Sequence, residues 1–222
     1  MADELPQVGP WAREKLKRLE KYLSAYTKIL SRQSWLKGFI YIDAFAGAGR
    51  SLVRRVRSEN ASGALLELGR EFRGNTEVAE ILHGSPRVAL DVEPPFTHYV
   101  FLDLDPSRLQ FLRAVEVEYR DRRKIYIREE DCNDYLRDLI ENGRTDWKKW
   151  RGVVFLDPFG MQVPWKTIAL LAQTKALEVF LNFPVGMAIQ RLLRRDAKLS
   201  DPTRFLSLLV LTRPARPSLT MC

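Results

Sequence analysis

The chain has 222 residues, and 45% of them are hydrophobic, which suits a packed globular core and excludes a disordered or fibrous protein. It contains no run of about eighteen apolar residues and no basic-then-apolar leader, so we expect a soluble, cytoplasmic protein without a membrane partner. Lys and Arg number 36 against 28 Asp and Glu, and the net charge of +8 favours a polyanionic partner such as nucleic acid.

Cysteine and histidine are too scarce for a disulfide framework or a metal centre. Cys132 and Cys222 have no second thiol at metal-ligand spacing, so we expect reduced thiols and no metal. His83 and His98 are wrongly flanked for a zinc site or a serine-based triad, and we expect them to be surface or structural residues.

The first predicted element is an amphipathic helix from Trp11 to about residue 31, within an N-terminal helical extension at residues 1–36. Basic residues separate apolar positions that recur at steps of three and four, which are Leu16, Leu19, Leu23, Tyr26 and Leu30. Such a helix covers an edge of the core and leaves its basic face in water. The alternative is a dedicated nucleic-acid-binding helix.

From Lys37 onward, short apolar runs alternate with loops and helical stretches, as in parallel strands that helices cover on both faces. We predict strands at residues 39–42, 98–102, 124–127, 152–156 and 177–181. We predict helices at residues 107–119, 133–142, 164–173 and 187–195. This order predicts a doubly wound α/β domain over residues 37–212, with ligands at the carboxyl ends of the strands.

The loop after the first of these strands, Asp43 to Gly49, is a candidate binding loop. Its two glycines allow a tight turn and a close approach of a ligand to the backbone. Leu52 stands where a dinucleotide fingerprint has its third glycine, and no Gly-Lys-Ser/Thr follows for a P-loop. Nicotinamide, flavin and nucleotide-hydrolysing sites are therefore disfavoured, while an ordinary strand-to-helix turn stays open.

Acidic residues also follow the later strands, at Asp103 with Asp105, at Asp131 and at Asp157. Carboxylates gathered at one sheet edge repel one another and resist burial, so we expect a ligand rich in donors, such as a ribose with an amine. Asp103 is placed to accept from both ribose hydroxyls, whereas Asp105 is expected to cap the next helix. For Asp131, a ligand contact and a helix cap are equally open.

The stretch Phe45-Ala-Gly-Ala-Gly49 after an acidic strand end resembles motif I of class I S-adenosylmethionine-dependent methyltransferases. Over roughly residues 11–195, four blocks in chain order resemble the three-Cys-motif partner protein family, TcmP: residues 39–50, 84–90, 156–161 and 185–191. The resemblance implies a Rossmann-like sheet of order 3-2-1-4-5, S-adenosylmethionine as cofactor, and a partner protein with three cysteines. It implies cofactor contacts from Asp43, Phe45, Ala46, Gly47, Gly49, Asp103, Asp131 and Cys132, the last packing near adenine.

The fourth predicted strand ends in Asp157-Pro158-Phe159-Gly160, which resembles the Asp/Asn-Pro-Pro-aromatic motif of nucleic-acid amino-methyltransferases. It departs from that motif, because its aromatic residue is third and a glycine ends it. The resemblance implies that Asp157, Pro158 and Phe159 are catalytic: a carboxylate accepts from the target NH₂, and an aromatic ring stacks on the base. The alternative is a structural type I turn, which Asp-Pro-x-Gly also favours.

The connection between the first two predicted strands is longer than a crossover needs, so we predict an insertion at residues 51–83. Its candidate substrate-binding residues, which leave from the ligand edge, are Arg50, Arg54, Arg55 and Arg57. A solvated loop is the alternative for this segment. Ser85 is expected to cap the helix that follows.

The C-terminal part offers one strand at residues 205–211 and an unstructured tail at residues 213–222, so we expect it to be truncated or divergent. Two functions stay open. The first is an enzyme, an S-adenosylmethionine-dependent N-methyltransferase that acts on a nucleic-acid amino group. The second is a noncatalytic methyltransferase-like protein that docks a three-Cys-motif protein.

Overall fold

A five-stranded parallel sheet forms the centre of the fold. The computed structural model describes residues 7–8, 11–55, 78–143, 145–158 and 162–182. The strands are β2 (Gly38–Asp43), β5 (His98–Leu102), β6 (Ile125–Arg128), β7 (Trp150–Leu156) and β8 (Leu177–Leu181). Their spatial order is β6-β5-β2-β7-β8, which is 3-2-1-4-5 when counted along the chain within this sheet. The predicted Rossmann-like arrangement is therefore confirmed.

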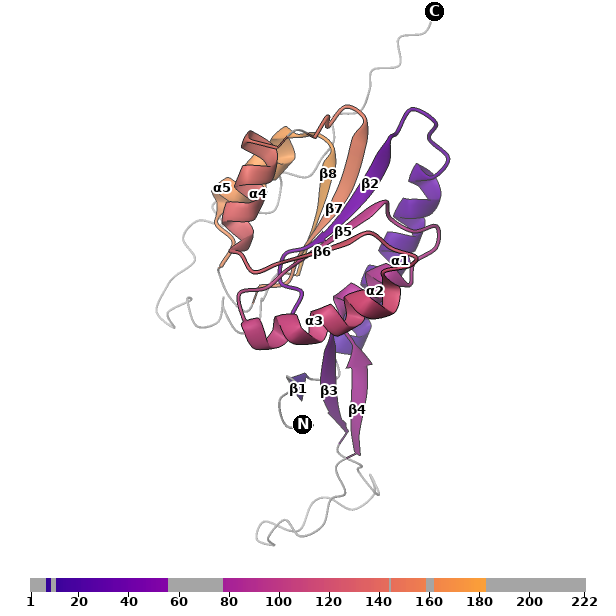
Figure 1. Cartoon of the computed structure of the whole chain (residues 1–222), viewed down its shortest axis with the longest axis vertical. Helices are drawn as coiled ribbons and strands as arrows, with labels where there is room; N and C mark the ends of the chain where they lie inside the picture. The colour runs from indigo at the N-terminus through magenta and orange to yellow at the C-terminus, as the bar shows by residue number, and fades with distance from the viewer. Residues whose placement is uncertain (1–6, 9–10, 56–77, 144, 159–161, 183–222) are drawn as a thin grey trace, which may run out of the picture. The chain divides into compact units, whose positions relative to one another are not determined.

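Helices cover both faces of this sheet, because its central strands are apolar on both sides. They are α1 (Trp11–Leu30), α2 (Ser85–Leu90), α3 (Pro106–Tyr119), α4 (Cys132–Glu141) and α5 (Trp165–Gln173). The first three share a hydrophobic cluster with Tyr41 and Phe155, whereas α4 and α5 share another with Ile42 and Val154. Figure 1 shows these two groups of helices on opposite sides of the strands. The doubly wound α/β class is thus confirmed.

α1 belongs to the core. Leu19 and Leu23 have no exposed surface, and Tyr26 also lies in the cluster that joins α1 to the sheet. Lys17 and Lys21 are exposed on the opposite side. The prediction that this helix covers the core and keeps a solvated basic face is confirmed, and its last residue is Leu30.

A second, three-stranded sheet combines the two ends of the predicted insertion with a short N-terminal strand. It contains β1 (Gln7–Val8), β3 (Arg50–Arg55) and β4 (Val78–His83) in the order β1-β3-β4, with β3 and β4 antiparallel. The alternative of a solvated loop for the whole insertion is therefore wrong at its two ends, which form β3 and β4. At the base of the hairpin, the Gly84 N–H donates to the Gly49 oxygen at 2.8 Å. Residues 56–77, between these strands, lie outside the described part.

The predicted helix caps are correct at α3 and wrong at α2. Asp105 precedes α3 and accepts from the Ser107 N–H. At α2 the capping position is Gly84, and no side chain bonds the helix end there. Ser85 is instead the first helical residue, and it is buried with its hydroxyl directed to Asp43. Because Ser85 lies inside the helix and does not cap it, its hydroxyl can donate to Asp43 at the end of β2.

Among the described residues, no helix is both long enough and apolar enough to span a membrane. The predicted C-terminal elements, a helix at residues 187–195, a strand at 205–211 and a tail at 213–222, fall outside the described residues.

Candidate functional site

The loop that follows β2 contains two glycines with left-handed backbone conformations. Gly47 has φ 61° and Gly49 has φ 67°, a region that side-chain-bearing residues rarely adopt. A Cβ atom on Gly47 would meet nothing within 4 Å, whereas one on Gly49 would lie 3.4 Å from Leu112 and Val115 of α3. Gly49 therefore lets the loop pack on α3, while Gly47 presents its backbone to open space.

This loop is tied to the end of the neighbouring strand β5. The Ala46 N–H donates to the Leu102 oxygen at 2.9 Å, and the Gly47 N–H donates to Asp103 Oδ2 at 2.9 Å. β2 lies at the point where the chain changes direction across the sheet, with β5 on one side and β7 on the other. In open α/β sheets, ligands bind outside the carboxyl ends of the strands at such a switch point. The loop with open space over Gly47 thus lies at the expected place.

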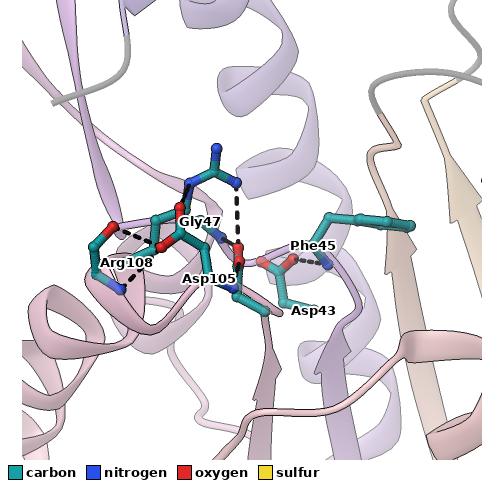
Figure 2. Close-up of polar contacts among 7 residues, drawn as sticks. Asp43, Phe45, Gly47, Asp105 and Arg108 are labelled. Carbon is teal, nitrogen blue, oxygen red and sulfur yellow. Dashed lines mark hydrogen bonds and ion pairs between the residues drawn. The ribbon is translucent and has the colours of Figure 1, made fainter. Parts of the chain in front are cut away.

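Asp103 holds the loop through backbone hydrogen bonds. Besides Gly47, it bonds the Asp105 N–H at 2.9 Å through Oδ1, and Arg108 lies 3.7 Å from Oδ2. Arg108 also pairs with Asp105, as Figure 2 shows. Only 8% of the Asp103 side chain is exposed. An ionised carboxylate has about four lone-pair positions, so two backbone donors leave acceptor capacity for a ligand.

Asp43, at the end of β2, is a fully buried carboxyl group. It accepts from the Phe45 N–H at 3.3 Å (Figure 2), from the Tyr41 hydroxyl at 3.3 Å, and from Ser85. Burial raises the pKa of Asp43 from 3.8 to about 7; the Ser85 hydrogen bond opposes this increase, and the negative charge of Asp157 adds to it. This carboxyl group therefore changes its charge near neutral pH.

Asp157, directly after β7, is held by two side chains from distant parts of the chain. Lys15 of α1 donates to Oδ2 in an ion pair, and the Asn182 amide donates to Oδ1 at 2.6 Å. The exposed fractions are 17% for the Lys15 side chain and 25% for Asp157. Neither Lys15 nor Asn182 was predicted as a site residue. Only the position of Asn182 just after β8 could have suggested a place at this edge.

The other predicted catalytic residues are only partly described. Pro158 is buried, and Phe159 lies outside the described residues. β7 pairs with β2, with Phe155 opposite Asp43, so Asp157 follows the strand next to the one that ends in Asp43. The role of the Phe159 ring stays a prediction.

Asp131 and Cys132 begin α4, at the end of β6. Asp131 caps this helix by accepting from the Asn133 N–H at 2.8 Å and the Asp134 N–H at 3.2 Å. The cap alternative is thus confirmed, and a cofactor contact stays a prediction. Cys132 is buried, and burial raises the pKa of its thiol to about 12. The thiol is therefore protonated at neutral pH and acts as an apolar packing group.

The arginines of the predicted substrate arm are described in part. The Arg50 guanidinium lies 4.8 Å from the centre of the Phe111 ring on α3. Arg54 and Arg55 belong to β3, but their side chains, like all of Arg57, are outside the described part. Within the described ranges, no cluster of three or more His, Cys, Asp and Glu side chains is arranged to hold a metal ion.

Comparison with known proteins supports the fold. No family model matches the chain, and no curated protein matches it, so the resemblance to the three-Cys-motif partner family stays a prediction. Among solved structures it is similar to protein LPL1258 from Legionella pneumophila str. Philadelphia 1, described by the family model DUF519. The TM-score is 0.50 at 17% identity, over 75% of this chain and 66% of that one. At this identity the similarity shows a shared α/β fold alone.

Proposed function

We propose that the protein is an S-adenosylmethionine-dependent N-methyltransferase that acts on an amino group of a nucleic acid. The observation that carries the proposal is Gly47, which has φ 61° and open space where a Cβ would stand, in a loop at the switch point of the sheet. Backbone exposed in this way permits close contact with a ligand. The absence of a third glycine and of a P-loop lysine favours this cofactor over dinucleotides and nucleoside triphosphates.

The residues at the edge have chemistry that fits the cofactor. Asp103 has the acceptor capacity for ribose hydroxyls, and Phe45, Ala46 and Gly49 shape the loop beside it. Asp131 and Cys132, which begin α4 after β6, are further candidate contacts, with Cys132 packing near adenine. When bound, S-adenosylmethionine supplies an electrophilic methyl group. A net positive charge on the ligand also suits an edge that contains Asp43 and Asp157.

Asp157 is the group that we assign to the acceptor. A carboxylate oxygen that accepts from an exocyclic NH₂ orients the nitrogen lone pair, and such alignment is a large part of the rate of a transfer reaction. The contacts with Lys15 and Asn182 limit the rotation of this carboxylate, so it is oriented before an acceptor binds. The net charge of +8 favours a polyanionic acceptor, with Arg50, Arg54, Arg55 and Arg57 as candidate contacts to its backbone.

A second candidate is a noncatalytic protein that uses this fold to dock a three-Cys-motif partner. The observation that favours it is the same Asp157, because both of its oxygens already accept hydrogen bonds from the chain's own donors. A carboxylate whose two oxygens are bonded by the chain itself can have a purely structural role, which is to stabilise the turn after β7.

Two measurements separate these candidates. Calorimetric titration should give binding of S-adenosylmethionine and S-adenosylhomocysteine, and much weaker binding of NAD and ATP. A labelled-methyl assay on DNA, RNA and protein should then give transfer to a nucleic acid, whose binding weakens steeply with salt because counterions are released. Cofactor binding without transfer to any acceptor would favour the docking protein, and no cofactor binding would reject the enzyme.

A further inference from the structure

The order of the strands arranges the candidate contacts in a line across the carboxyl edge. Asp131 follows β6, Asp103 follows β5, the glycine loop follows β2, and Asp157 follows β7. Adjacent strands are about 4.8 Å apart, so Asp103 and Asp157 begin from strands separated by roughly 10 Å. If adenine lies toward β6 and ribose lies over β5, the amino-acid end of the cofactor extends across β2 toward β7.

A pair of opposite charges is located at that end of the line. Lys15 reaches from α1 to Asp157, and 17% of its side chain is exposed. The amino-acid end of S-adenosylmethionine is itself a zwitterion, with a carboxylate and an ammonium group. An ammonium side chain has three N–H donors, so a hydrogen bond to Asp157 does not by itself exhaust Lys15.

We infer that Lys15 is a cofactor-binding residue whose ammonium group donates to the carboxylate of the amino-acid end of S-adenosylmethionine. This inference rests on the proposed function. It gives α1 a role in the site beyond covering the core. Partial burial strengthens such a contact, because charges screened less by water interact more strongly.

The contact is tested by comparing ligands with and without the amino-acid end. Wild type and Lys15→Met are titrated with S-adenosylhomocysteine and with 5′-methylthioadenosine, which keeps the adenosine part and lacks the amino-acid end. We expect Lys15→Met to weaken S-adenosylhomocysteine about tenfold or more, the effect of a lost charge-assisted hydrogen bond, and to leave methylthioadenosine unchanged. Competition against labelled S-adenosylmethionine extends the comparison to weak ligands.

Lys17→Met is the matched control, because it removes the same charge from an exposed position on the same helix. It should change neither affinity, and Lys15→Arg should recover part of the loss. Equal weakening of both ligands by Lys15→Met would show an effect through the fold and overturn the inference, as would no weakening of either. A wild type that binds neither ligand, nor S-adenosylmethionine, would instead reject the proposed function and with it the inference.

Discussion

The two strand ends beside β2 hold their carboxylates in different ways. Asp103, after β5, accepts from two backbone N–H groups that lie close to it in space, those of Gly47 and Asp105. Asp157, after β7, accepts from two side chains, Lys15 and Asn182, and Lys15 is 142 residues away in the chain.

This difference separates a carboxylate that shapes the backbone from one that side chains position. The N–H groups that donate to Asp103 can move away only if the backbone moves. Asp103 therefore fixes the conformation of the glycine loop with or without a ligand. The donors to Asp157 are side chains of α1 and of the segment after β8, so the orientation of this carboxylate depends on how these distant elements pack. Asp43 lies between the two and is fully buried, so its charge costs free energy in the folded state.

The largest effect is expected at Asp43, from a pH-dependent change in stability. Its folded pKa of about 7 exceeds the ordinary value of 3.8, so the folded state keeps a proton that the unfolded state has lost. Stability therefore falls as pH rises from about 4 to about 7, and the full cost is roughly 4 kcal/mol. Asp43→Asn should stabilise the protein at about pH 8, by up to that amount, and much less at about pH 5.

Urea unfolding of wild type and Asp43→Asn at both pH values measures this difference. Asp105→Asn serves as the control, because Asp105 is exposed and hydrogen bonds with Ser107 lower its pKa. An equal change in unfolding free energy at both pH values would contradict the assignment of a raised pKa to Asp43.

The next effect concerns transfer, at Asp157. Asp157→Ala should reduce single-turnover methyl transfer by about 100-fold or more, because the target amine loses its alignment. The affinity for S-adenosylmethionine should change by no more than a few-fold. If the residue serves only a turn, then melting temperature, cofactor affinity and rate should all fall together.

A smaller effect is expected for cofactor binding, at Asp103. Asp103→Ala should weaken S-adenosylmethionine by about 1.5–3 kcal/mol, the contribution of charge-assisted hydrogen bonds to the ribose. Asp105→Ala provides the comparison, since it removes a nearby acid that caps α3. Calorimetry that finds unchanged affinity in a folded Asp103→Ala variant would rule out the ribose contact.

The smallest effect is expected for stability, at the third acidic strand end. Asp131 caps α4, so Asp131→Ala should lower the free energy of unfolding by about 1 kcal/mol. The same variant sharpens the cofactor assignment. A loss of S-adenosylmethionine affinity, beyond what Asp105→Ala causes at the α3 cap, would show that Asp131 also contacts the ligand.

The central sheet and the main loop could be predicted because their signals are local. Five apolar runs lie within a few residues of the observed strands, and their order along the chain agrees with a doubly wound sheet. Local signals also predicted the tight turn at Gly47 and Gly49, which have positive φ, and the cap that Asp105 provides to α3. Each of these effects involves only a few neighbouring residues. The strands β3 and β4 were missed, because the arginine-rich segment of β3 and the short segment of β4 lack a clear alternation.

The sequence by itself thus determined which residues form the central sheet and which loop lies at its switch point. The tertiary structure alone decided how the carboxylates there are held. It joined Lys15 and Asn182 to Asp157, turned Ser85 toward Asp43, and placed Gly84 against Gly49. These contacts join residues far apart in the chain, and they depend on the register in which α1, α2 and β8 pack on the sheet, which no local pattern of residues encodes.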